Sequence, residues 1–118
     1  MIIMTLLSIN LRCWLLTCPI HGQESNFGQD KTCLVRKPTG EIGEFQIRPI
    51  FERDIKRITN GRFAVNPSNS GSSRVAVYIW LKHYLPRAEK RHERRMTTEE
   101  VLEMYRTGYS GYCKKKGI

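Results

Sequence analysis

The stretch RVAVYIWLKHYL, residues 74–85, is the feature that most restricts how this chain can fold. Wound as a helix, it carries apolar residues on nearly every side, so it must be covered by other parts of the chain. The preceding NPSNSGSS is a loop whose serines can cap a helix, and Pro86 follows the apolar stretch. We therefore predict a central, buried helix that ends at Pro86.

The N-terminal segment MIIMTLLSINLRCWLLTC is apolar, but an arginine interrupts it, and it lacks a basic start and a small-residue cleavage site. It differs in this way from a signal peptide, and it is short and broken for a membrane span. Apolar residues at helical spacing predict a helix over 5–17, which Pro19 and Gly22 should kink or end. We expect residues 1–18 to be an uncleaved helix of one domain, residues 1–118, with a signal or anchor as the alternative.

Two shorter helices are predicted further along. PIFERDIKRITNG opens with Pro49, which suits a first helical turn, and it stops at Asn60-Gly61. TTEEVLEMYRTG opens with a capping box from Thr97 to Glu100.

The remaining segments are rich in residues that break helices. Residues 26–43 predict a long loop, in which CLVRKPTGEIG could form a minor β-hairpin. Gly108 and Gly111 should interrupt the chain near its end, and the lysines at 114–116 should be frayed and solvated. The fold class is therefore mainly α, with several short helices around the central buried helix.

The chain is strongly basic. Twenty Lys and Arg against eleven Asp and Glu give a net charge of +9, which favours polyanionic partners such as nucleic acid, anionic lipid or cell-wall polymers. The run RAEKRHERR concentrates this charge and is either a solvated surface or a polyanion-binding patch. No helix-turn-helix, zinc-finger or RNA-binding fingerprint accompanies it, so we expect no specific nucleic acid partner. A small basic nucleic-acid-binding protein is the alternative from another functional class.

The four cysteines are irregularly spaced and include no C-x-x-C pair. Cys18 and His21 have C-x-x-H spacing, but no set of four ligands with zinc-site spacing is present. We expect no metal and no cofactor, and free thiols of which some are buried. Disulfides are the alternative for an exported protein.

The stretch QESNFGQD places an acid, Glu24, where an apolar segment gives way to a small, polar, glycine-containing loop. Such an acid is either a solvated helix end or a carboxyl held half-buried for a chemical purpose.

The motifs ESNFG and GEIGEFQIRP resemble those of the lytic transglycosylase and goose-type lysozyme group. In that group an E-S pair ends a helix, and a G-x-x-G-x-x-Q-I-x-P segment follows about twenty residues later. The residues that match the second motif are Gly40, Gly43, Gln46, Ile47 and Pro49.

A third motif lies near the C-terminus. MYRTGYSG matches the later helix of that group at Tyr105 and Gly108, but Arg106 replaces its usual Asn. NPSNSGSSRVAVYIWLKHY is also similar to its phage and bacterial branch. The resemblance covers about Leu11 to Lys115.

The resemblance implies a lysozyme-like fold and cleavage of the β-1,4 bond between MurNAc and GlcNAc in peptidoglycan. In lytic transglycosylases one Glu, here Glu24, protonates the leaving oxygen and then acts as base while the muramoyl C6 hydroxyl closes an anhydro ring. A lysozyme-type hydrolase of the same bond is the alternative. It would need a second carboxylate to hold a water, and Asp30, Glu41 and Glu44 are the candidates.

The resemblance also implies roles around Glu24. Ser25 would help to orient it, Gln46 would bind sugar groups, and Tyr105 would point its hydroxyl toward the site. Arg106 could favour the ionised carboxylate and hinder an acid, or bind a muramoyl carboxylate or peptide stem. Tyr109, among glycines, could line the cleft. The expected substrate-binding residues are therefore Ser25, Gln46, Tyr105, Arg106 and Tyr109.

The expected partner is the glycan strand of peptidoglycan, bound by a monomer in the cell envelope, in the periplasm or from a phage particle. The N-terminus could add membrane association. A cleaved signal peptide is doubtful because its removal would delete most of the helix that supports Glu24. A catalytically inactive wall-binding relative is a further alternative.

Overall fold

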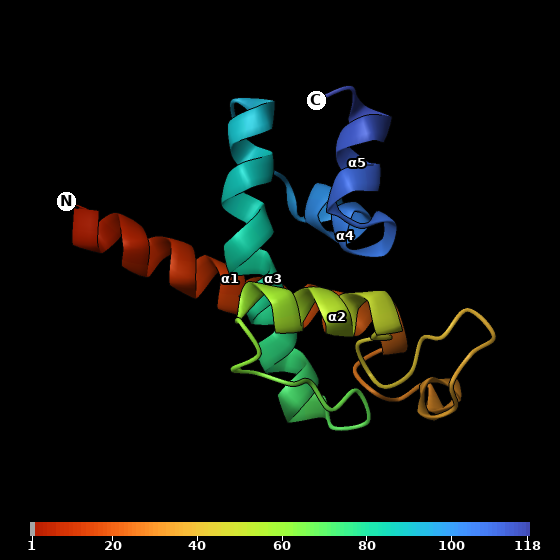
Figure 1. Cartoon of the computed structure of the whole chain (residues 1–118). Helices are drawn as coiled ribbons and strands as arrows, with labels where there is room; N and C mark the ends of the chain where they lie inside the picture. The colour runs from red at the N-terminus through yellow and green to blue at the C-terminus, as the bar shows by residue number, and fades with distance from the viewer. Residues whose placement is uncertain (1) are drawn as a thin grey trace.

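The computed structural model describes residues 2–118, with side chains from residue 9 onward. The elements in chain order are α1 (Ile2–Ser25), the 3-10 helix η1 (Lys31–Leu34), α2 (Pro49–Ile58), α3 (Ser70–His92), α4 (Thr98–Thr107) and α5 (Tyr109–Lys116) (Figure 1). Residues 2–118 contain no strand, and an isolated antiparallel bridge joins Ile42 to Ile47. The prediction of a mainly α fold is confirmed, whereas the hairpin around CLVRKPTGEIG is replaced by η1 and this single bridge.

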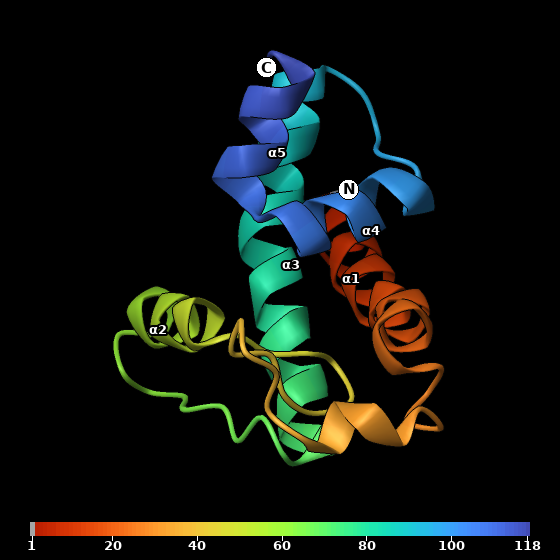
Figure 2. The ribbon, with the colours of Figure 1, turned by 90° about the vertical axis from the view of Figure 1, so that its right-hand side faces the viewer.

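Helix α3 is the central element, as its apolar pattern predicts. α1, α2 and α5 each pack against it, and α4 packs against α1 and α5 (Figures 1 and 2). α5 lies alongside the C-terminal half of α3 (Figure 2). The buried residues of α3 are Ser73, Ala76, Val77, Trp80, Leu81, Leu85 and Ala88.

Helix α1 continues to Ser25, so Pro19 and Gly22 do not end it. The carbonyl that loses its partner at Pro19 belongs to Leu15, which is 61% exposed, so water can replace the lost hydrogen bond. Burial of Ile20 beyond the proline stabilises the continued helix. At Gly22 a Cβ atom would lie 2.7 Å from the Phe27 ring, so glycine is required there by packing.

Two other expected interruptions are also absent. α3 runs through Pro86 to His92, because Pro86 and Lys82, whose carbonyl loses its partner, both lie on the exposed side. Gly108 separates α4 from α5 with a φ of 86°, but Gly111 lies within α5. The lysines expected to be frayed belong to α5, and Lys115 and Lys116 form ion pairs with Glu103 at 2.8 and 2.9 Å.

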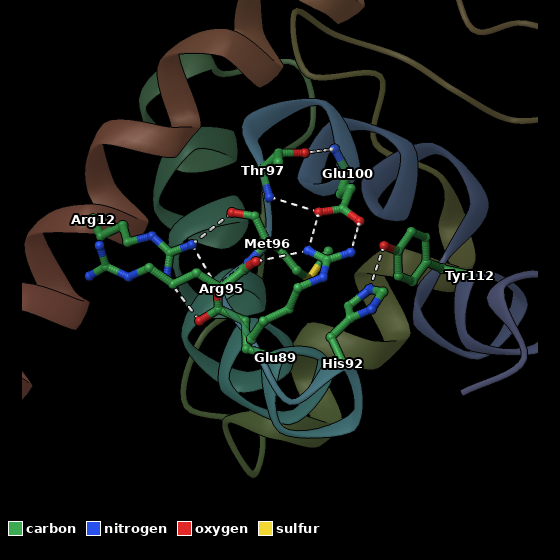
Figure 3. A network of polar contacts seen from close by, with 9 residues as sticks. Arg12, Glu89, His92, Arg95, Met96, Thr97, Glu100 and Tyr112 are labelled. Carbon is green, nitrogen blue, oxygen red and sulfur yellow. Dashed lines mark hydrogen bonds and ion pairs between the residues drawn. The ribbon is translucent and has the colours of Figure 1, made fainter.

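A charged junction ties α1 to the end of α3 (Figure 3). Arg12 donates to both carboxylate oxygens of Glu89, at 2.8 and 2.6 Å, and to the carbonyl of Met96. The Met96 amide donates to Glu89 in turn, at 2.6 Å. Burial opposes the charge of Glu89, but the hydrogen bonds from Arg12 and Met96 outweigh it and lower the pKa of this carboxyl.

The start of α4 is held by the predicted capping box. The Thr97 hydroxyl accepts from the Glu100 amide, and the Glu100 carboxylate accepts from the Thr97 amide (Figure 3). Arg94 adds two hydrogen bonds to the same carboxylate, at 2.9 and 2.7 Å. These bonds, first those from Arg94, lower the pKa of Glu100 to about 2.

The described helices include none that is both long and apolar enough to cross a membrane. All four cysteines are free thiols, as expected, and Cys13, Cys33 and Cys113 are buried. Burial raises the pKa of Cys13 to about 11, so this thiol packs as a small apolar side chain.

Candidate functional site

Glu24 lies in the last turn of α1, where the helix gives way to a tight turn. The next residues, Asn26 and Phe27, adopt left-handed backbone conformations, with φ of 49° and 57°. The amide of Gly28 then donates to the Ser25 hydroxyl at 2.9 Å. This turn ends the helix at Ser25, the residue after Glu24.

The Glu24 side chain is only 11% exposed. Its Oε2 accepts hydrogen bonds from Gln23 Nε2 at 2.8 Å and from Arg106 Nε at 3.3 Å. No described residue forms a hydrogen bond with its Oε1. This oxygen is at least partly exposed, because every fully buried side-chain oxygen in the described part of the chain has a hydrogen-bond partner. Oε1 is therefore open to a ligand, whereas Oε2 is held by the protein.

Glu24 faces a cavity of about 370 Å³. The cavity, which we call the acid pocket, is lined by Glu24, Lys37, Thr39, Glu41, Gln46, Arg48, Phe51, Tyr105 and Arg106. Four of the residues that the motifs singled out, Glu24, Gln46, Tyr105 and Arg106, thus lie around one cavity although they come from three separate segments.

Gln46 is held on the pocket wall by a strained turn. Its φ is 51°, and both its backbone amide and its side-chain Nε2 donate to the carbonyl of Gly43, at 3.0 and 2.8 Å. The side-chain amide therefore braces this turn. No described residue bonds its Oε1, which leaves an acceptor beside the cavity.

Tyr105 lines the acid pocket and also belongs to the hydrophobic core. It is 7% exposed, and its hydroxyl donates to the Phe45 carbonyl at 2.7 Å. Burial, and then the negative charge of Glu24, raise the pKa of Tyr105 well above its ordinary value. The phenol therefore stays protonated and anchors α4 to the Gly43–Gln46 turn.

Ser25 lies outside the acid pocket. Its hydroxyl is buried, accepts from Gly28 and lies 3.5 Å from the His21 carbonyl, so it braces the turn after α1. The expected contact between Ser25 and Glu24 is not formed.

A buried histidine fastens the loop that carries Gln46. His21 stacks on Phe45 with ring centroids 4.6 Å apart, and its Nε2 lies 2.7 Å from Glu44 Oε1. Its Nδ1 lies 3.0 Å from Arg74 Nη2. Because a guanidinium only donates, Nδ1 accepts and Nε2 carries the proton that is donated to Glu44. One turn before Glu24, His21 thus joins α1, this loop and the start of α3.

Tyr109 lines a second cavity, of about 500 Å³, and not the acid pocket. We call this the aromatic pocket. The two cavities share Arg48, Phe51 and Tyr105, so they adjoin. Tyr109 stacks on Tyr84 there, with ring centroids 4.7 Å apart.

Several lining residues were not singled out from the sequence. Arg48 and Phe51 flank Pro49 at the start of α2, and Arg48 occupies the variable position of the QIRP motif. The signal that could have identified Arg48 and Phe51 is their closeness to Gln46 in the sequence, at two and five residues after it. Lys37 and Thr39 belong to a loop without regular structure, and no sequence pattern marked them.

Among the candidate second carboxylates, Glu41 alone lines the acid pocket. Asp30 caps η1 through the Thr32 amide and hydroxyl, and Glu44 is bound to His21. The Glu41 carboxylate accepts from the Thr39 hydroxyl, which lowers the pKa of Glu41. Glu41 is therefore an ionised acceptor on the wall of the acid pocket.

The described residues contain no group of three or more His, Cys, Asp or Glu side chains placed to hold a metal ion. The acid pocket contains the carboxyls of Glu24 and Glu41, an amide, a phenol and cationic side chains. Comparison of the chain with protein-family models, with curated proteins and with solved structures finds no significant match.

Proposed function

We propose that this protein is a peptidoglycan-cleaving enzyme of the lytic transglycosylase type, with a lysozyme-like fold. It cuts the β-1,4 bond between MurNAc and GlcNAc. The observation that carries the proposal is the carboxyl of Glu24, 11% exposed, with one oxygen held by the protein and the other open to a cavity beside Gln46 and Tyr105.

The chemistry requires a proton at the leaving oxygen as positive charge develops on the sugar ring. A general acid that is held in position contributes about 10²–10⁴-fold in rate. Glu24 Oε1 delivers this proton. The resulting carboxylate then takes the proton of the muramoyl C6 hydroxyl as that oxygen closes the anhydro ring, so no water and no second carboxylate are needed.

The other groups bind and orient the glycan. The free Oε1 of Gln46 accepts from a sugar amide or hydroxyl. Arg106, 61% exposed, pairs with Glu24 in the free protein and can turn to an acidic group of the substrate.

The position of Glu41 supports a second candidate function, which is hydrolysis of the same bond. It lies on the wall of the acid pocket and is ionised at neutral pH, so it could hold an attacking water. The two reactions give different products, since transglycosylation leaves anhydro ends and hydrolysis leaves reducing ends.

The test is incubation of the purified protein with peptidoglycan, followed by mass analysis of the soluble fragments. Anhydro ends support the proposal, and reducing ends support hydrolysis. Glu24→Gln should lower the rate at least about 100-fold, while Glu99→Gln, an exposed control on α4, should leave it unchanged. Release of no fragments by the unaltered protein, or full activity of Glu24→Gln, contradicts the role of Glu24.

The substrate also sets the place of action. Peptidoglycan lies outside the cytoplasmic membrane, so the protein works in the cell envelope or is carried in a phage particle, and we propose that it does so as a monomer. Its net charge of +9 favours approach to an anionic wall. Size-exclusion chromatography with light scattering tests the monomer, and sequencing of the mature N-terminus tests whether residues 1–18 are retained.

A further inference from the structure

The aromatic pocket is larger than the acid pocket and is not required by the proposed reaction. Its volume is about 500 Å³, and its apolar wall is formed by Phe51, Trp80, Tyr84, Tyr105 and Tyr109. These rings contact one another, with Trp80 edge-on to Tyr105 at 5.5 Å and Tyr84 stacked on Tyr109 at 4.7 Å. The rings therefore support one another in a continuous apolar wall.

Three arginines, from α2 and the residue before it, border this apolar wall. Arg57 is neutralised by Asp54 at 2.6 Å, and the Tyr84 hydroxyl also donates to Asp54 at 2.7 Å. Arg48 donates only to the Arg106 carbonyl, at 3.3 Å, and Arg53 bonds no described residue. Two guanidinium groups thus face the pocket without a carboxylate partner among the described residues.

An apolar wall beside unpaired guanidinium groups matches a particular kind of ligand. Guanidinium groups bind carboxylates through two parallel hydrogen bonds, while the rings cover methyl and methylene groups. A neutral sugar would leave both charges unused. The chemistry therefore selects a short chain that carries carboxylates and apolar groups together, as an acidic peptide does.

The position of the aromatic pocket indicates what such a peptide is attached to. The aromatic pocket adjoins the acid pocket at Arg48, Phe51 and Tyr105, so one molecule can occupy both. We infer that the aromatic pocket binds an acidic peptide branch of the same glycan strand that Glu24 cuts. The inference rests on the proposed function. It makes a peptide-bearing strand the preferred substrate over a bare strand.

The experiment measures binding and cleavage separately. Binding uses a short synthetic peptide with two free carboxylates and the same peptide with both amidated, titrated by calorimetry against the Glu24→Gln protein. We expect the free acid to bind at least about tenfold more tightly at low salt, since a charge-assisted hydrogen bond is stronger than a neutral one. Raising the salt concentration should reduce this difference.

Arg53→Gln isolates the site, because Arg53 lines the aromatic pocket and not the acid pocket. It should weaken binding of the free acid about tenfold and lower the ratio of kcat/KM for peptide-bearing glycan to kcat/KM for bare glycan. Arg62→Gln is the matched control, since Arg62 is exposed and lines neither pocket. It should change neither quantity.

The two proposals fail in different ways. Equal binding of both peptides, or an unchanged ratio in Arg53→Gln, overturns the inference while cleavage by Glu24 stands. Tight binding of a bare chito-oligosaccharide that is displaced by no peptide also overturns it, because the pocket is then part of the glycan groove. Specific peptide binding by a protein that releases no wall fragments supports the pocket and contradicts the proposed function.

Discussion

Arg106 Nε donates to Glu24 Oε2 across 3.3 Å, although the two residues are 82 positions apart in the chain. The pair joins the last turn of α1 to the last turn of α4 at the mouth of the acid pocket. Arg106 is mostly exposed and Glu24 mostly buried, so the cation can leave while the carboxyl stays in place. The motif that this chain resembles has Asn at the position of Arg106. Because Arg106 is charged, it forms an ion pair with Glu24 that Asn could not form.

Arg106→Gln removes this cation from Glu24. In the proposed function this guanidinium also binds an acidic group of the substrate. We expect KM for peptidoglycan to rise about tenfold, because a charge-assisted hydrogen bond to the substrate is lost, while kcat changes by less than about threefold.

The control is Arg62→Gln, whose KM and kcat should match those of the unaltered protein, since Arg62 is exposed and lines neither pocket. An unchanged KM with a fall in kcat would show that Arg106 positions Glu24 and does not bind substrate.

Glu41→Gln separates the two reactions considered for the acid pocket. Under transglycosylation no water is activated, so we expect anhydro products to persist and the rate to stay within about threefold, well short of the 10²–10⁴-fold effect of losing a general base. Mass analysis of the fragments reports both quantities. A fall of 100-fold or so, with reducing ends among the residual products, would assign Glu41 as the base of a hydrolase.

Gly43→Ala tests the packing of the loop that carries Gln46. Gly43 has a φ of 88°, and an added Cβ would overlap the carbonyl oxygen of Pro67. Gly61→Ala is a matched control, because Gly61 has a φ of 77° but no atom within 4 Å of an added Cβ. Both substitutions carry the left-handed backbone cost of roughly 1–2 kcal/mol.

We expect Gly43→Ala to lower the free energy of unfolding by about 2 kcal/mol more than Gly61→Ala, because overpacking adds to the backbone cost. Urea unfolding measures both values. Equal losses in the two variants would mean that the Pro67 segment moves aside easily and does not hold the Gly43–Gln46 turn.

We expect the folded protein to lose stability in acid because of the carboxylate of Glu89. Its pKa in the folded protein is lowered from 4.5, against the burial that would raise it, by the bonds from Arg12 and Met96. The native carboxylate therefore contributes stability above about pH 4.5 that is lost as the pH falls through its lower, folded pKa. Glu100, whose pKa is lowered to about 2, extends this loss further into acid.

Glu89→Gln should lower the free energy of unfolding at pH 7 by about 1–3 kcal/mol, since Arg12 loses its charged partner. The loss should become smaller as the pH falls below 4.5, because the unaltered protein then loses the same interaction. Glu99→Gln, an exposed change in the first turn of α4, should show the same pH dependence of stability as the unaltered protein. A deficit in Glu89→Gln that is independent of pH would contradict the contribution of this charge.

Periodicity and capping signals predicted α2, α3 and α4, because amphipathic spacing and capping residues act within a few residues of one another. The same local reasoning allowed a helix end at Pro19 or Gly22 and predicted one at Pro86, and both helices continue past these residues. At those positions the helices continue because exposed carbonyls can bond water and because buried residues beyond the break are stabilised by packing.

The candidate site was likewise predicted only in part from the sequence. Motif order predicted that Glu24, Gln46 and Tyr105 would be neighbours, and they line one cavity. It also grouped Ser25 and Tyr109 with them, but Ser25 braces a turn and Tyr109 lies in the aromatic pocket. Which way a side chain points depends on the turn that carries it, and no motif spacing contains that information.

The amino-acid sequence by itself determined the helical class, the central apolar helix and the acid at the end of the first helix, since these follow from local propensity and apolar pattern. Only the tertiary structure decided that Arg106 pairs with Glu24, that Glu41 shares its cavity and that unpaired arginines border an aromatic wall. These are contacts between segments far apart in the chain, and they exist only once burial of the core has brought those segments together.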